Sequence, residues 1–139
     1  MAEKQPRGIR NNNPLNIRKG SNWKGERPKQ TDKAFEEFES MEYGIRAALK
    51  LIRNHISGFG GKRIPANTLK KLITVWAPPT ENHTQSYIET VCKHTGLLPS
   101  QVLHVGDRKN IVAICRAMAF VECGVWLDEE LFDSAWDLM

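Results

Sequence analysis

The sequence has few cysteines, no long apolar segment and no repeat, and each of these absences argues against a class of protein. Its three cysteines, Cys92, Cys115 and Cys123, form an odd number without a CxxC spacing, so neither a disulfide framework nor a zinc site is predicted. No apolar run approaches the roughly 20 residues that span a bilayer, so we expect no membrane insertion. The four histidines are scattered, and we expect no metal and no cofactor.

We also expect no secretory signal, and the charge balance is not strongly one-sided. The first residues, MAEKQPRG, include no apolar region of the kind that a signal peptide needs. If the protein acts outside the cytoplasm, something else must carry it there. The 20 basic and 16 acidic residues give a net charge of +4. This modest excess suits an anionic partner such as cell-wall material, nucleic acid or a membrane surface, and the cations are too dispersed to favour a nucleic-acid-binding module.

The residues that are present predict one mainly helical (α+β) domain over 1–139, with 1–6 flexible. Hydrophobic residues at 40% and charged residues at 26% are typical of a globular chain of 139 residues. Segments 15–18 (LNIR) and 33–38 (KAFEEF) predict a small N-terminal β-hairpin. Apolar residues at three-and-four spacing predict five helices after it. Their expected first or capping residues are Ser40, Thr68, Thr84, Asp107 and Asp128.

Glu122 is the first candidate catalytic residue. It lies four residues after Met118 and extends the apolar stripe of its helix, just before the expected stop at Gly124. Apolar neighbours and the negative end of the helix dipole should both raise the pKa of this carboxyl. A carboxylic acid that keeps its proton near neutral pH can act as the proton donor in glycosidic cleavage. The alternative is a glutamate that turns to solvent or pairs with Arg10 or Arg116.

Two further stretches could bind a sugar. In NNNPLN, four amides surround a proline, and Asn13 and Asn16 are our candidates for binding hydroxyl groups. The structural alternative is a turn whose asparagines bond nearby backbone. In WAPPTENHTQSY, aromatic rings flank amide and carboxylate side chains, although Trp76 also fits the apolar face of its helix. The candidate substrate-binding residues in this second stretch are Trp76, Glu81, Asn82 and Tyr87.

These motifs carry a resemblance to a known group of proteins. The combination of RGIRNNNPLNIR, the segment FEEFESMEYGIRAA and the corner WAPPTENHTQSYI resembles small lysozyme-like proteins from phages and prophages of Bacteroides-like bacteria, often described as virion or structural proteins. More distantly, the same stretches are similar to autolysin glucosaminidases of the lysozyme superfamily. In those enzymes the catalytic glutamate precedes the amide turn, whereas here FVECG at 120–124 supplies a similar helix end. The resemblance therefore implies a circularly permuted lysozyme-like domain in which Glu122 returns to the catalytic place.

The resemblance implies cleavage of peptidoglycan glycan strands by a muramidase, glucosaminidase or lytic transglycosylase. Glu122 would be the general acid. The first candidates for the second carboxylate are Glu37 and Glu36, which on a strand would point to opposite faces; Glu26, Asp32 and Glu81 are further candidates. If no second carboxylate serves, an intramolecular transglycosylase mechanism is favoured. Without a secretory signal, a phage particle or a holin would have to deliver the protein to the cell wall. The alternatives are a non-catalytic virion or cell-wall-binding protein, with other virion proteins as partners, and a basic nucleic-acid-binding module.

Overall fold

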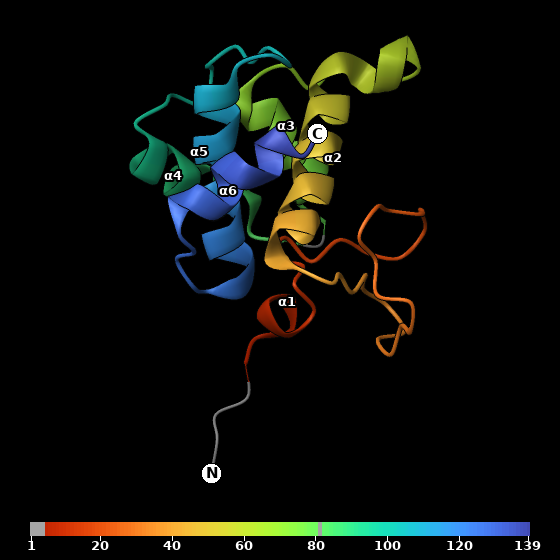
Figure 1. Ribbon diagram of the computed structural model, residues 1–139. Helices are drawn as coiled ribbons and strands as arrows, with labels where there is room; N and C mark the ends of the chain where they lie inside the picture. Colours follow the sequence, from red (N-terminus) through yellow and green to blue (C-terminus); the bar gives the residue numbers. More distant parts are fainter. Residues whose placement is uncertain (1–4, 81) are drawn as a thin grey trace.

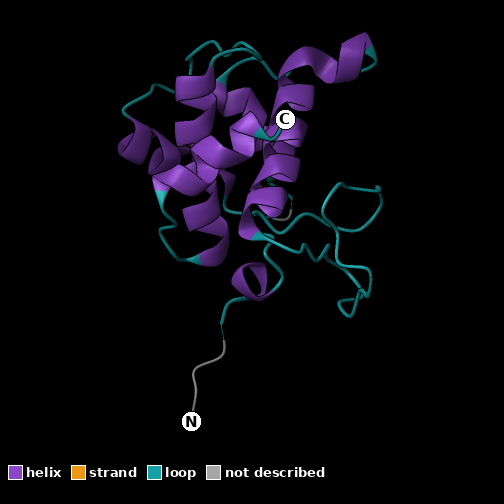
Figure 2. Ribbon diagram, in the orientation of Figure 1, coloured by secondary structure: helices purple, strands orange, loops and turns teal. Residues whose placement is uncertain are grey.

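The computed structural model describes residues 5–80 and 82–139, and this part of the chain contains six helices. Their bounds are α1 Arg7–Arg10, α2 Met41–Gly61, α3 Leu69–Trp76, α4 Thr84–Thr95, α5 Arg108–Cys123 and α6 Glu129–Asp137. Figure 1 shows α6 lying across α2 and α5, while the segment between α1 and α2 forms loops beside the first turns of α2. The expectation of a mainly helical protein is confirmed, and Figure 2 shows helices and loops throughout.

Three of the expected helix starts are capped by the predicted side chains. Ser40, Thr68 and Asp107 each accept a hydrogen bond from the backbone N–H three residues further on, at the starts of α2, α3 and α5. Asp128 precedes α6 as expected, without a side-chain bond of this kind. Local sequence therefore determines where most of these helices begin.

The expected capping role of Thr84 is not observed. His83 stands at the cap position and Thr84 is the first residue of α4. The Thr84 hydroxyl donates to the main-chain carbonyl of Ala77 instead. This bond ties the start of α4 to the end of α3, and so fixes the corner that carries Trp76 and Tyr87.

A glycine-rich segment interrupts α2 after its first regular part. Gly58, Phe59 and Gly60 have φ angles of +72°, +54° and +70°, in the left-handed region where a right-handed helix cannot continue. Glycine adopts this conformation readily, whereas Phe59 needs support. The edge of His55 packs on its ring at 4.9 Å between centroids, and the guanidinium of Arg63 lies 4.7 Å from the ring centroid.

The core is formed by the apolar stripes of α2 and α5, and α6 covers both. Each fully buried Leu, Ile or Phe side chain stabilises the fold by roughly 1.5–3 kcal/mol. Side chains with 0% exposure on these three helices include Ile45, Leu49, Ile52, Ile111, Ile114, Met118 and Phe132. These buried positions recur at helical spacing, and Glu122 follows Met118 along the same stripe.

The expected β-hairpin is replaced by loops that touch at isolated antiparallel bridges. Arg18 pairs with Phe35, and the backbone N–H of Glu36 donates to the carbonyl of Ile17 at 3.0 Å. The two segments therefore run side by side without forming regular strands in the described part of the chain. One reason is that the Asn13 amide donates to the carbonyls of Ile17 and Glu36, so a side chain takes bonds that a ladder would use.

The asparagine-rich turn packs directly against α2. A Cβ at Gly44 would lie 1.7 Å from the main-chain oxygen of Asn12, so only glycine permits this approach. Asn12 and Asn16 have φ angles of +52° and +53°, a left-handed conformation that asparagine tolerates better than most residues. This contact fixes the turn, and with it the direction of the Asn16 side chain.

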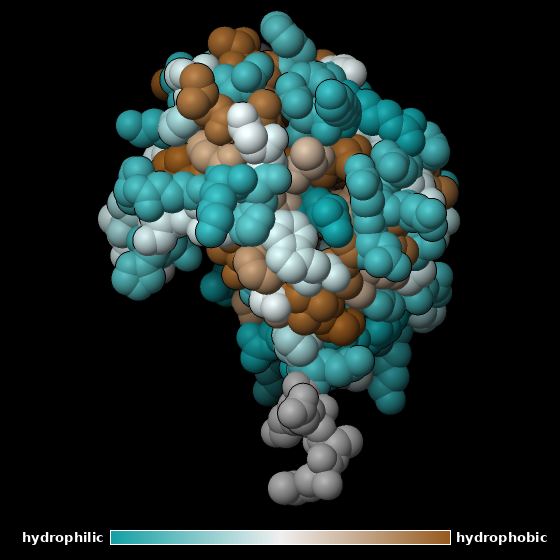
Figure 3. Space-filling view, turned by 90° about the vertical axis from the view of Figure 1, so that its left-hand side faces the viewer, coloured by the Kyte–Doolittle hydropathy of each residue, from teal (hydrophilic) through white to brown (hydrophobic). Residues whose placement is uncertain are grey.

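The surface in Figure 3 is mostly hydrophilic, with separate apolar patches. Within residues 5–80 and 82–139, no helix has both the length and the hydropathy needed to cross a bilayer. All three cysteines are unpaired: Cys115 and Cys123 are buried and Cys92 is half-buried.

Candidate active site

Glu122 lies where the end of α5 meets the asparagine-rich turn. The Tyr87 hydroxyl on α4 donates to its Oε2 atom at 3.0 Å. The Asn16 amide donates to its main-chain carbonyl at 3.4 Å, which joins residues 106 positions apart. An ion pair with Arg10 or Arg116 is not formed within the described residues. The structure therefore brings together three candidates that are far apart in the sequence.

Burial raises the pKa of the half-buried Glu122 carboxyl above its ordinary value. Hydrogen bonding from Tyr87, Asn16 and Trp76 acts in the opposite direction, because these donors favour the ionised form. Desolvation is the larger effect, and the nearby carboxyl-terminal end of α5 also disfavours negative charge. Glu122 therefore keeps its proton to a higher pH than an exposed glutamate does.

Two hollows adjoin at the contact between Asn16 and Glu122. The first, which we call the tryptophan hollow, has a volume of about 410 Å³ and is lined by Asn16, Trp23, His55 and Trp76 among others. The second, the glutamate hollow, has a volume of about 270 Å³ and includes Asn82, Tyr87 and Glu122. Aromatic rings can cover the apolar faces of a sugar while amides bond its hydroxyl groups. The pair of hollows thus has the chemistry of a carbohydrate site.

Of the four amides in NNNPLN, Asn16 is the one that reaches this site. Asn13 is fully buried, and its amide bonds to main-chain atoms of Ile17 and Glu36. Asn11 donates to Asp32, and Asn12 donates to the carbonyl of Phe38. We therefore correct the expectation that Asn13 binds substrate. Its side chain presents no surface to a ligand, and its hydrogen bonds stabilise the turn.

Glu37 is occupied by structural contacts. It is 2% exposed, and its carboxylate accepts bonds from the backbone N–H groups of Thr31 and Asp32, from the Thr31 hydroxyl and from Arg27. Burial acts to raise the pKa of Glu37, but these hydrogen bonds outweigh it and hold the pKa below its ordinary value. A carboxylate bound on all sides cannot turn toward a substrate, so we correct the expectation for Glu37.

Glu36 is also buried, and its carboxyl lies beside that of Glu26. Desolvation, a hydrogen bond to Glu26 and the negative charge of Glu26 raise its pKa to about 7, against the opposing effect of Lys19. Glu36 is absent from the described residues that line either hollow. It is therefore engaged in a carboxyl pair of its own and is a poor second carboxylate for Glu122.

The remaining candidates lie in or near the corner between α3 and α4. Trp76 and Asn82 line the tryptophan and glutamate hollows, respectively, and Asn82 also donates to the carbonyl of Pro78. Glu81 lies outside the described residues. Sequence reasoning missed His55 and Trp23, which line the tryptophan hollow. The signal for Trp23 was a large aromatic residue within an otherwise polar N-terminal segment.

A larger hollow lies elsewhere in the described part of the chain. It has a volume of about 850 Å³, and its mainly apolar lining includes Ile64, Val75 and Pro99. None of the candidate residues takes part in it. Its chemistry suits apolar contact rather than proton transfer.

The comparison with known proteins supports a phage relationship. The chain is 37% identical over 122 residues to Protein P5 of Pseudoalteromonas phage PM2, which covers 85% of this chain and 71% of that protein. The chain belongs to the family of phage PM2 Protein P5. No family model matches it. The expected link to phages is confirmed, whereas the name Protein P5 gives no activity.

Proposed function

We propose that this member of the Protein P5 family cleaves glycan strands of peptidoglycan, with Glu122 as the general acid. The observation that carries the proposal is the position of Glu122. It is a half-buried carboxyl with a raised pKa, held by Tyr87 and lining one of two hollows that adjoin between aromatic and amide side chains. Besides Glu122, the described lining of the glutamate hollow includes no lysine or arginine and offers amide and hydroxyl groups suited to the hydroxyls of a sugar.

The proposed reaction begins when Glu122 transfers its proton to the glycosidic oxygen, and the bond between that oxygen and C1 breaks. Glu36 and Glu37 are both engaged in contacts of their own, which favours the route that needs one carboxylate. In that route the C6 hydroxyl of the same sugar attacks C1, and the Glu122 carboxylate takes its proton. The products are a strand with a 1,6-anhydro end and a departing strand with a free hydroxyl group, and the acid form of Glu122 is regenerated. If water attacks instead, the enzyme is a muramidase or glucosaminidase.

The test is release of soluble fragments from purified cell walls by the wild-type protein and by Glu122→Gln. Loss of release in Glu122→Gln, with no loss in the exposed matched control Glu89→Gln, supports the proposal. Equal release by wild type and Glu122→Gln would remove Glu122 from the chemistry. Mass spectrometry of the new ends then separates anhydro products from hydrolysed ones.

A second candidate function is wall binding without cleavage, in a virion or wall-binding protein. The contacts of Glu122 favour it in one respect, because the bond from Tyr87 could equally serve to hold a half-buried carboxyl for stability. This function predicts that the wild-type protein sediments with insoluble cell walls and releases nothing.

A further inference from the structure

The tryptophan hollow carries two cationic side chains that the proposed cleavage does not use. Arg18 and Lys19 are among its lining residues, and the described residues of that lining include no carboxylate. The glutamate hollow has Glu122 as its acidic residue and neither lysine nor arginine among its described residues. The two hollows therefore differ in charge, with the cations on the side of the tryptophans.

The charges of Arg18 and Lys19 are accessible. Arg18 is exposed and Lys19 is half-buried, and neither forms an ion pair within the part of the chain that the structure describes. The guanidinium of Arg18 lies 5.0 Å from the ring centroid of Phe35, its partner in the bridge, and this contact orders the side chain. Lys19 lies close enough to the buried Glu36 to oppose the rise in the pKa of that carboxyl.

Another wall of the tryptophan hollow belongs to a long stretch of the sequence that has no acidic residue. Residues 43–80 contribute His55 and Trp76 to this wall. The same stretch contains seven lysines and arginines and no aspartate or glutamate, although the net charge of the whole chain is only +4. None of these seven side chains lines the tryptophan hollow itself, so their effect there is a long-range attraction for anionic ligands. The hollow is therefore suited to a ligand that combines sugar rings with negative charge.

Peptidoglycan contains such a unit. Its strands alternate between an N-acetylglucosamine without an ionised group and a muramic sugar that bears a short peptide with free carboxylates. We infer that the tryptophan hollow binds the peptide-bearing muramic sugar, with Arg18 and Lys19 binding carboxylates of its peptide. The inference rests on the proposed function and adds a preference to it: strands that keep their peptides bind better than stripped strands.

Binding is measured in the Glu122→Gln background, in which the proposed turnover is absent. The probes are soluble glycan fragments that carry their peptides, and the same fragments after an amidase has removed the peptides. Replacing Arg18 and Lys19 together by glutamine should weaken binding of the peptide-bearing fragments by about fivefold, the size expected for two partly exposed ion pairs. Binding of the stripped fragments should stay the same.

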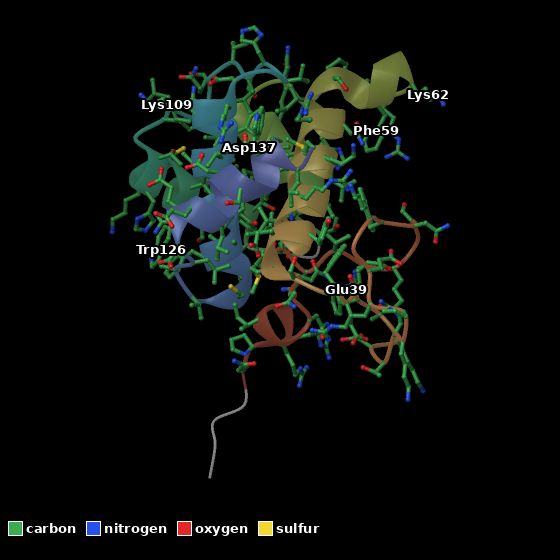
Figure 4. The ribbon with its side chains drawn as sticks, in the orientation of Figure 1. Glu39, Phe59, Lys62, Lys109, Trp126 and Asp137 are labelled. Atoms are coloured by element: carbon green, nitrogen blue, oxygen red, sulfur yellow. The ribbon has the colours of Figure 1, made fainter. Side chains whose placement is uncertain are left out.

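The matched control replaces two cations outside the hollow, Lys93 and Lys109, by glutamine. Both are exposed, and Figure 4 shows Lys109 at the start of α5, away from the loops between α1 and α2. The control makes the same change in net charge and should leave binding of both fragments unchanged. Lys19→Gln alone provides a milder variant that leaves the contact between Arg18 and Phe35 in place, and it should show part of the effect.

Three results would overturn the inference: equal weakening for both fragments, no weakening for either, or the same weakening in the control pair. Failure of the proposed function is visible separately. If the wild-type protein prefers peptide-bearing fragments but releases nothing from cell walls, cleavage is refuted and the binding inference stands. If it releases fragments without any such preference, cleavage stands and the inference is refuted.

Discussion

Replacing Tyr87 by phenylalanine tests the electrostatics of the site most sharply. The substitution keeps a ring that is 6% exposed and removes the hydroxyl that donates to Glu122 at 3.0 Å. A hydrogen bond to a charged group contributes about 1.5–3 kcal/mol. Because a pKa difference of one corresponds to about 1.4 kcal/mol, the already raised pKa of Glu122 should increase by roughly one to two.

The same change predicts a pH-dependent loss of stability. The pKa of Glu122 is higher in the folded protein than in the unfolded chain, so ionisation of this carboxyl destabilises the fold as the pH rises above the ordinary glutamate range. Tyr87→Phe enlarges this penalty. We expect a loss of about 1.5–3 kcal/mol at pH 8, where the unfolded chain is fully ionised, and about 1 kcal/mol or less at pH 4, where the carboxyl is mostly protonated in both states.

The assay is a carbon NMR titration of glutamate carboxyls, with the Glu122 signal assigned by its disappearance in Glu122→Gln. Urea unfolding at pH 4 and pH 8 provides the stabilities. A Glu122 midpoint that stays the same or falls in Tyr87→Phe would refute the reasoning, because the hydroxyl would then not stabilise the carboxylate. An equal loss of stability at both pH values would refute it as well.

Three further predictions concern the framework around the site. Gly44→Ala should lower the free energy of unfolding in urea by about 3 kcal/mol, because the added Cβ would meet the main-chain oxygen of Asn12. The control Gly106→Ala, which has open space around it, should lower it by less than about 1 kcal/mol. Equal losses in the two variants would contradict the close approach of Gly44 to Asn12. Glu37→Gln should lower the free energy of unfolding by about 2–3 kcal/mol at pH 7. Because the pKa of Glu37 is lowered in the folded protein, this difference from wild type should shrink as the pH falls through and below the ordinary glutamate range. A difference that keeps its full size at pH 3 would contradict this prediction. Glu36→Gln should melt at a higher temperature than wild type at pH 8 and at a similar temperature at pH 5, because the pKa of Glu36 is raised to about 7. A difference in melting temperature between Glu36→Gln and wild type that is the same at both pH values would count against this.

The helices and the place of Glu122 could be predicted because both follow from local spacing. The stripe that ends at Met118 has the periodicity of a helix, and adding one turn puts Glu122 on the buried face. Caps at Ser40, Thr68 and Asp107 lie within three residues of the groups that they bond. Interactions of this range are visible in a single sequence.

The roles of the N-terminal amides and acids could not be predicted, because distant parts of the chain decide them. Asn13 is inside the turn because it bonds Glu36, 23 residues away, whereas Asn16 reaches Glu122 across 106 residues. Glu36 and Glu37 are neighbours in sequence and yet have pKa values displaced in opposite directions. No local feature of the sequence distinguishes these residues, because the role of each depends on which distant backbone or carboxyl group its side chain contacts.

The central claim is that the proton on Glu122 drives cleavage of the glycan. The most direct measurement is the pH dependence of wall solubilisation by the wild-type protein, compared with the NMR midpoint of the Glu122 carboxyl in the same protein. The account predicts that release declines on the alkaline side at that midpoint, and that both move upward together in Tyr87→Phe. A protein that binds walls and releases nothing at any pH, or one whose alkaline decline stays in place while the Glu122 midpoint moves, would contradict it.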